Sequence, residues 1–125
     1  MATWCFMLIL VLLMPLFMIG FGRVIITNAP KDINTSFGYR TKRSMKNQDT
    51  WAFAHKHFGK TWFVCGLVLI PVSLVPMFLV MGREADVVRT TGFIILGVQL
   101  VLMLGAILPT ETALKNSFDE FGRPR

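Results

Sequence analysis

The stretch that decides the fold is Trp62–Met81, WFVCGLVLIPVSLVPMFLVM, which holds no ionisable side chain except the thiol of Cys65. About 17 to 25 mostly apolar residues are enough for a helix to cross a hydrocarbon layer of about 30 Å. Two more stretches share this character: Trp4–Phe21, in which Cys5 carries the only ionisable group, and Gly92–Pro109. The chain is therefore predicted to cross a membrane three times.

The expected fold class is all-α, because hydrocarbon supplies no water to satisfy exposed backbone amides. We expect an integral membrane protein with three transmembrane helices plus short amphipathic cytoplasmic helices. Residues 1–125 are interpreted as one domain, with spans at about 4–22, 62–82 and 91–109, a basic loop and amphipathic helix over 23–60, and a tail helix over 110–122. The first segment lacks the positive start of a cleavable signal peptide and is expected to remain a membrane helix.

Positive charge gathers between the first two spans. Eight Lys and Arg side chains lie between Arg23 and Lys60, against two aspartates. Because Lys and Arg mark the cytoplasmic side, we expect the N-terminus outside and both this loop and the C-terminal tail in the cytoplasm. The cations also favour a lipid bilayer with anionic headgroups as a partner, whereas that surface would compete with nucleic acid, which is not expected to bind.

Polar and small residues within the spans predict helix contacts. Gln99 would be costly facing lipid and should turn toward another helix, where Ser73 is a possible partner. Gly97 and Gly105 lie about two turns apart and share a face, which we expect to pack against the first or second helix. The spans contain no Asp, Glu, Lys, Arg or His, which argues against an ion-coupled transporter or a proton relay.

The loop between the first two spans carries the most specific pattern. Gly38 permits a backbone conformation closed to other residues, and Arg40 brings five hydrogen-bond donors. Trp51 adds a large amphipathic ring suited to a membrane interface. These residues form either a recognition surface for a peptide or protein, or internal anchors that tie the loop to the helices.

A helix is expected to follow this loop. Asn47 is a good N-cap, and an apolar face at helical spacing comes after it. That face consists of Trp51, Ala54, His55 and Phe58. The helix over Gln48–His57 either lies on the membrane surface or extends the second span, with Gly59 marking any bend.

A second short helix is expected in the C-terminal tail. Thr110 is the expected N-cap after Pro109, and Gly122 can end the helix. Glu111 and its acidic neighbours could dock against the basic loop through partly screened pairs, and packing of Phe118 on Trp51 or Phe58 is expected to contribute more.

An enzyme or metal site is not predicted. His55 and His57 are two residues apart and point to different sides of a helix, so they do not readily share one metal. No nucleophile, base and orienting partner occur at a recognisable spacing. We therefore predict no catalytic residue, no metal and no cofactor.

Two motifs together resemble a known family. The loop and the helix after it contain Asn34, Gly38, Tyr39, Arg40, Thr41, Ser44, Trp51, His55 and Gly59, and the tail contains Thr110, Glu111, Phe118 and Gly122. Their order and spacing resemble the SdpI family of bacterial membrane proteins, over roughly Asn28–Gly122. The resemblance implies that these residues form a partner-binding or structural motif.

The resemblance also implies a function. It suggests a multi-pass protein of the bacterial cytoplasmic membrane, whose namesake confers immunity against a secreted peptide toxin and holds a transcriptional repressor at the membrane. We therefore expect a non-enzymatic membrane interaction protein, with a peptide toxin or a cytoplasmic repressor as possible partners. The alternative is a small transport or channel subunit, which at this length would require a homo-oligomer.

Overall fold

The computed structural model describes residues 2–28, 31, 33 and 38–125 and shows an all-helical membrane protein. Its helices are α1 (Ala2–Asn28), α2 (Gln48–Leu79), α3 (Ala85–Gly105) and α4 (Ile107–Ser117). Three helical stretches are long and apolar enough to cross a membrane: α1, α2, and α3 taken together with α4. The predicted fold class is confirmed.

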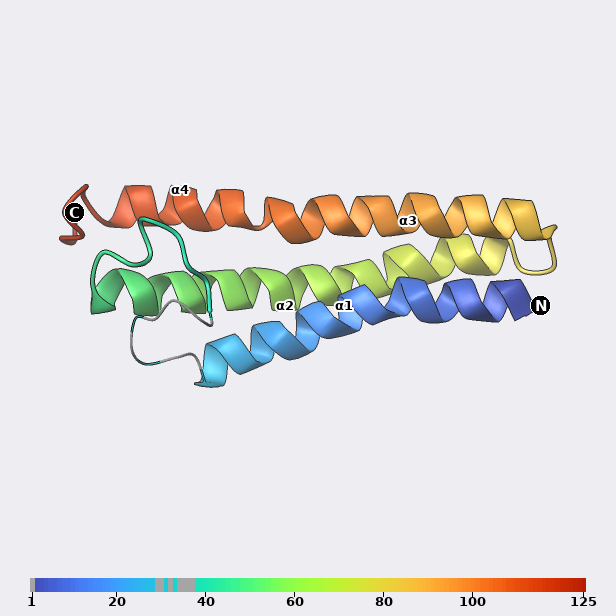
Figure 1. The fold of residues 1–125 in the computed structure, drawn as a ribbon, viewed down its shortest axis with the longest axis horizontal. Coiled ribbons are helices and arrows are strands. Elements are labelled where there is room, and N and C mark those ends of the chain that lie inside the picture. The colour runs from blue at the N-terminus through green and yellow to red at the C-terminus, as the bar shows by residue number, and fades with distance from the viewer. Residues whose placement is uncertain (1, 29–30, 32, 34–37) are drawn as a thin grey trace.

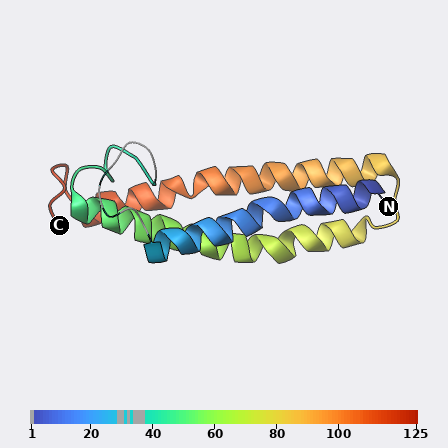
Figure 2. The same cartoon turned by 60° about the horizontal axis from the view of Figure 1, so that its bottom comes forward.

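The helices form an elongated bundle (Figure 1). The N-terminus lies beside the short turn that joins α2 to α3, and we call this the turn end. The C-terminus, the start of α2 and the loop before it lie at the opposite end, which we call the loop end. The α4 helix continues the line of α3 after a short interruption, as both views show (Figure 2).

The α2 helix decides between the two interpretations of Gln48–His57. It runs unbroken from Gln48 to Leu79, so the amphipathic segment is an extension of the second span and not a separate surface helix. At about 1.5 Å per residue its 32 residues exceed the hydrocarbon thickness. The charged turns with Lys56 and Lys60 therefore project from the uncharged part, which begins at Trp62.

Gly59 has a different role from the bend considered in the sequence. It lies inside the continuous α2 helix, where α1 and α2 cross at Gly22. A Cβ atom on Gly59 would lie 2.8 Å from the carbonyl oxygen of Gly22 and 2.9 Å from Cγ2 of Ile25. Only a residue without a side chain allows the two backbones to approach this closely.

Hydrogen bonds from buried side chains tie the three spans together. The Gln99 amide nitrogen donates to the Ser73 hydroxyl and to the Val11 carbonyl, each at 2.7 Å. The predicted pairing of Gln99 with Ser73 is thus confirmed, and the bond to α1 adds a third helix to it. Nearer the loop end, the Trp62 indole donates to the Met103 carbonyl at 3.1 Å.

The prediction that Gly97 and Gly105 pack against another helix is wrong. A Cβ atom on either glycine would meet nothing within 4 Å, and Gly97 is exposed. The buried residues of α3 are instead Val88, Gly92, Ile95 and Gln99, which lie on a different side of the helix. The helix turns the amide of Gln99 inward, and this places the small residues outward.

The helix ends also differ from the sequence expectation. The α3 helix already begins at Ala85, so the connection from α2 is shorter than expected. Thr110 lies inside α4 and is not its N-cap; Pro109 falls in the first turn, where its missing N–H costs no bond. The α4 helix ends at Ser117 because Phe118 is extended, so Gly122 belongs to a turn beyond the helix.

Candidate functional site

The motif residues that the structure describes gather at the loop end. We call residues Gly38–Trp51 together with His55, Glu111 and Gly122 the loop-end module. Asn34, the first residue of the predicted motif, lies outside the described residues. The module brings together three segments that are distant in the sequence: the loop, the start of α2, and the tail with α4.

His55 is the anchor of the loop. The backbone N–H of Tyr39 donates to Nε2 of His55 at 2.9 Å, and Nδ1 lies 2.8 Å from the carbonyl oxygen of Trp51. A carbonyl only accepts, so Nδ1 carries the proton and the ring is neutral. Both ring nitrogens are therefore used within the fold, which leaves neither for a metal.

The burial of His55 has an electrostatic consequence. The side chain is 0% exposed, and its ring packs against Trp51 with a centroid distance of 4.2 Å. Burial penalises the charged imidazolium and lowers the pKa of His55 below its ordinary value, although the Trp51 carbonyl opposes this. His55 lies in the charged extension of α2, before the uncharged span begins at Trp62.

Gly38 is required by its neighbour and by its own backbone. Its φ angle is +112°, in a region that residues with a side chain rarely adopt. A Cβ atom there would lie 2.4 Å from Nε2 of His55. The glycine thus lets the loop approach the histidine closely enough for the Tyr39 bond to form.

Tyr39 connects the loop to α4. Its hydroxyl donates to Oε1 of Glu111 at 2.8 Å, and its ring packs on Phe58 with a centroid distance of 4.7 Å. Burial, together with the hydrogen bond and the negative charge of Glu111, raises the pKa of Tyr39. The phenol therefore stays protonated and keeps donating to Glu111 at every physiological pH.

Ser44 holds the turn that follows. It is 0% exposed, and its hydroxyl oxygen accepts the Thr41 N–H at 2.8 Å and lies 3.0 Å from the Tyr39 carbonyl, to which it can donate. The Ser44 carbonyl in turn accepts a bond from the hydroxyl of Thr50 at 3.0 Å. These contacts fix the turn from Thr41 to Asn47 against the start of α2.

The predicted N-cap at Asn47 is confirmed, and it forms a capping box with Thr50. The Asn47 side chain accepts from the Thr50 N–H at 2.9 Å, while the Thr50 hydroxyl accepts from the Asn47 N–H at 3.0 Å. Sequence reasoning missed Thr50, because the usual capping-box signature has Glu or Gln three residues after the N-cap. Asn47 also donates to the Gly122 carbonyl at 2.7 Å, which attaches the tail.

The remaining tail residues complete the packing. Thr110 is 0% exposed, and its hydroxyl donates to the Ala106 carbonyl at 3.1 Å. Phe118 packs edge-on against Phe53, with a centroid distance of 5.4 Å. A hydrogen bond from the backbone N–H of Arg123 holds the pKa of the Asp119 carboxyl below its ordinary value, and the Phe121 N–H and the Arg123 side chain act in the same direction.

Exposure separates the predicted motif residues into two groups. Tyr39, Trp51 and His55 are buried and face the interior of the module. Arg40 is exposed, and so are the next two cations, Lys42 and Arg43. The basic side chains of the turn therefore form the outer surface, while the other motif residues lie beneath it.

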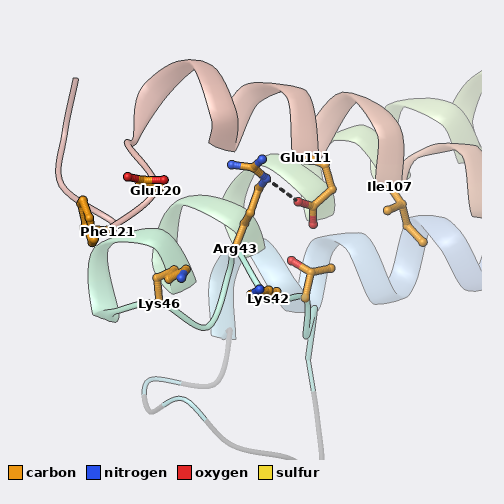
Figure 3. A pocket seen from close by; sticks show the side chains of 8 residues that line it. Lys42, Arg43, Lys46, Ile107, Glu111, Glu120 and Phe121 are labelled. Carbon is orange, nitrogen blue, oxygen red and sulfur yellow. Dashed lines mark ion pairs between the residues drawn. The ribbon is translucent and has the colours of Figure 1, made fainter.

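An open pocket of about 730 Å³ lies on this outer surface (Figure 3). Lys42, Arg43 and Lys46 contribute its positive charge, and Arg43 turns toward Glu111, with 3.8 Å between Nε and Oε2. This ion pair confirms the expected contact between the acidic tail and the basic loop. Ile107 borders one end of the pocket, and Glu120 and Phe121 border the opposite end (Figure 3).

Among the residues that the structure describes, no group of three or more His, Cys, Asp or Glu side chains could hold a metal ion. His57 contacts the hydroxyl of Thr110 at 3.3 Å, on a different side of α2 from the His55 bond to Tyr39.

Comparison with known proteins agrees with the expected family. The SdpI/YfhL protein family matches residues 31–110. The chain is also 40% identical over 45 residues to the uncharacterized protein YfhL of Bacillus subtilis (strain 168); the match covers 36% of this chain and 41% of that relative. No solved structure matches the chain. Because the family match covers more than half of the sequence and includes the loop and both spans that follow it, the chain belongs to the SdpI/YfhL protein family.

Proposed function

We propose that the chain is a non-enzymatic membrane interaction protein of SdpI type, which protects its cell from a secreted peptide toxin, docks a cytoplasmic regulator, or does both. The observation that carries this proposal is the chain of hydrogen bonds from Trp51 through His55 and Tyr39 to Glu111. These hydrogen bonds use the motif residues to position the loop, and the basic side chains remain on the outer surface. An ordered, charged surface of this kind is better suited to binding a partner than to catalysing a reaction.

The orientation in this proposal follows from charge. The loop side of the first two spans carries eight Lys and Arg residues between Arg23 and Lys60. The turn end carries Arg83 and Arg89 together with Glu84 and Asp86. By the positive-inside rule the loop-end module faces the cytoplasm of a bacterial cell, where a regulator could reach it.

Toxin challenge tests the protective role directly. Cells with and without the protein are exposed to the peptides that their own strain secretes, and survival is compared. We expect the cells that lack the protein to be sensitive to at least one of these peptides. Equal sensitivity to all of them would sink the immunity proposal.

Two matched variants then test the surface. Arg40→Ala removes an exposed cation of the motif, and Lys115→Ala removes an exposed cation of α4 with the same change in charge. We expect Arg40→Ala to lose protection while still inserting into the membrane, and Lys115→Ala to keep it. Protection by both variants would show that Arg40 is not part of the docking surface.

A transport or channel subunit is the second candidate. Its supporting observation is an apolar hollow of about 470 Å³ on the outer side of α3, beside the unpacked Gly97 and bordered by Ile94 and Val101. A second copy could pack there and help to enclose a pathway. Cross-linking in native membranes is expected to trap oligomers under this proposal, and a monomer without flux in reconstituted vesicles would contradict it.

A further inference from the structure

We propose that the pocket at the loop end is a binding site for an anionic phospholipid, with the lipid phosphate held by Lys42, Arg43 and Lys46. The acyl chains would leave the pocket past Ile107 along the outer side of α3 and α4. This inference is independent of toxin protection and of regulator docking, because it requires only that the bundle spans a membrane.

The cations lie on a short, well-anchored turn. The Met45 N–H donates to the Thr41 carbonyl at 3.1 Å, and the Lys46 N–H donates to the Arg43 carbonyl at 3.4 Å. Ser44 is fully buried beneath them. The backbone that carries the three exposed cations is therefore already ordered, which lowers the entropic cost of gathering them around one phosphate.

The acidic side chains of the pocket, Glu111 and Glu120, offset only part of the charge of its three cations. Glu111 is already engaged, because it accepts the Tyr39 hydroxyl and lies beside Arg43. The Arg43 contact joins Nε to Oε2 at 3.8 Å, which is longer than a hydrogen bond, so the guanidinium fork can turn toward a phosphate. Glu120 is exposed to solvent on the far wall (Figure 3).

The depth of the pocket favours a lipid over a soluble anion. Ile107 follows Met103 by about one helical turn, and the Met103 carbonyl accepts the bond from the Trp62 indole. Trp62 is the first residue of the uncharged part of α2, so this contact lies at the edge of the apolar spans. The Ile107 end of the pocket therefore lies just outside the uncharged spans, where a lipid headgroup can reach it.

The apolar wall continues out of the pocket. Ile107 is 38% exposed and the neighbouring Leu108 is 71% exposed, and both belong to the stretch that crosses the membrane with α3. Phe121 is 67% exposed on the opposite wall. A phospholipid matches both properties, because its charged head meets cations while its acyl chains follow an exposed apolar path. An acidic peptide would match only the first.

Lipid retention by the purified protein tests the proposal. The full chain, in mild detergent micelles doped with either phosphatidylglycerol or phosphatidylcholine, is examined by native mass spectrometry. We expect the wild type to retain one phosphatidylglycerol in preference to phosphatidylcholine. The double variant Lys42→Ala/Lys46→Ala should lose this retention by about tenfold or more, because each cation near a phosphate contributes.

Two further variants separate the pocket from general charge and from folding. Lys56→Ala/Lys60→Ala removes two exposed cations of α2 and makes the same change in net charge, and it should keep the lipid. Lys42→Arg/Lys46→Arg keeps the charge in the pocket and should also keep the lipid. Equal retention by the pocket double variant and the wild type would overturn the proposal, as would equal loss in both alanine pairs.

Competition identifies the source of the anion. Glycerol phosphate has the headgroup charge without acyl chains, and a glutamate-rich peptide has the charge of an acidic protein. We expect neither to displace phosphatidylglycerol at equal concentration. Displacement by glycerol phosphate would show a site for free phosphate, and displacement by the peptide would show a protein docking surface; either result overturns the lipid assignment.

Discussion

At the scale of single residues, several residues of the predicted motif make internal contacts around one histidine. Gly38 approaches the ring of His55, Tyr39 donates to it, and Trp51 packs on it. The spacing of Trp51 and His55 predicted an apolar helix face, and their burial confirms that face. The spacing could not show that the loop folds back onto it, because this contact joins residues that only the bend of the chain brings together.

The first prediction concerns Gly38. Gly38→Ala should lower the free energy of unfolding by more than the strain of a positive φ angle, which costs about 1 to 3 kcal/mol, since its Cβ atom also collides with His55. Gly82→Ala is the matched control, because Gly82 has a φ angle of +82° and open space around it. Denaturant unfolding in detergent micelles measures both losses. A loss at Gly38 no larger than that at Gly82 would argue against the close contact.

The second prediction concerns the protonation of His55. Burial lowers the pKa of His55 in the folded protein. At pH values between the pKa of the folded protein and that of the unfolded chain, the unfolded chain therefore binds more protons. Stability should therefore be fully present above the ordinary histidine pKa of about 6.5 and should fall as the pH decreases below it. Protonation at Nε2 also removes the acceptor of the Tyr39 N–H.

Thermal unfolding between about pH 7.5 and pH 5.5 tests this dependence. His55→Gln should reduce the change in melting temperature over this range, because its side chain does not titrate. His57→Gln serves as the control and should leave most of the change in place. An unchanged pH dependence in His55→Gln would assign the effect to another group.

At the scale of helices, glycine positions decide how closely α1 and α2 can pack. Gly22 and Gly59 lie at the crossing, whereas Gly97 and Gly105 face away from the other helices. All four glycines lie in or beside the apolar segments of the sequence. The sequence could not distinguish the two groups, because the rotation of α3 in the bundle is set by the hydrogen bonds of Gln99.

The third prediction follows from this difference. Gly59→Ala should destabilise the protein by about 1 to 3 kcal/mol, because its Cβ atom meets the Gly22 backbone and the Ile25 side chain. Gly97→Ala should have little effect or a slight stabilising one, because it meets no neighbour and alanine favours a helix. Melting temperatures in micelles compare the two variants. A larger loss at Gly97 would mean that α3 has a packing partner there.

At the scale of the whole molecule, the bundle has two different ends. The turn end is a short connection between α2 and α3, and the loop end gathers the motif, the tail and most of the positive charge. The number of spans, the unequal charge and the N-cap at Asn47 were all predictable from the sequence. The tail was predicted less well, because α4 begins earlier than Thr110 and ends before Gly122.

The fourth prediction concerns the orientation of the bundle. In a background with Cys5→Ala and Cys65→Ala, a single cysteine introduced by Glu84→Cys should react with a membrane-impermeant maleimide added to intact cells. A cysteine introduced by Lys46→Cys should react only after the membrane is permeabilised, because its loop carries the cytoplasmic charge signal. Labelling of Lys46→Cys from outside would reverse the proposed orientation.

By itself, the sequence determined the three spans, the all-helical class, the family and the end at which positive charge accumulates. These properties depend on residues close together in the chain, because hydrocarbon selects for long uncharged helices and the charge count needs no contacts. Only the tertiary structure decided that Trp51 and His55 are buried, that Tyr39 reaches Glu111, and that the basic turn borders an open pocket. Those contacts join segments far apart in the sequence, and their geometry is set by how α1, α2 and α4 pack.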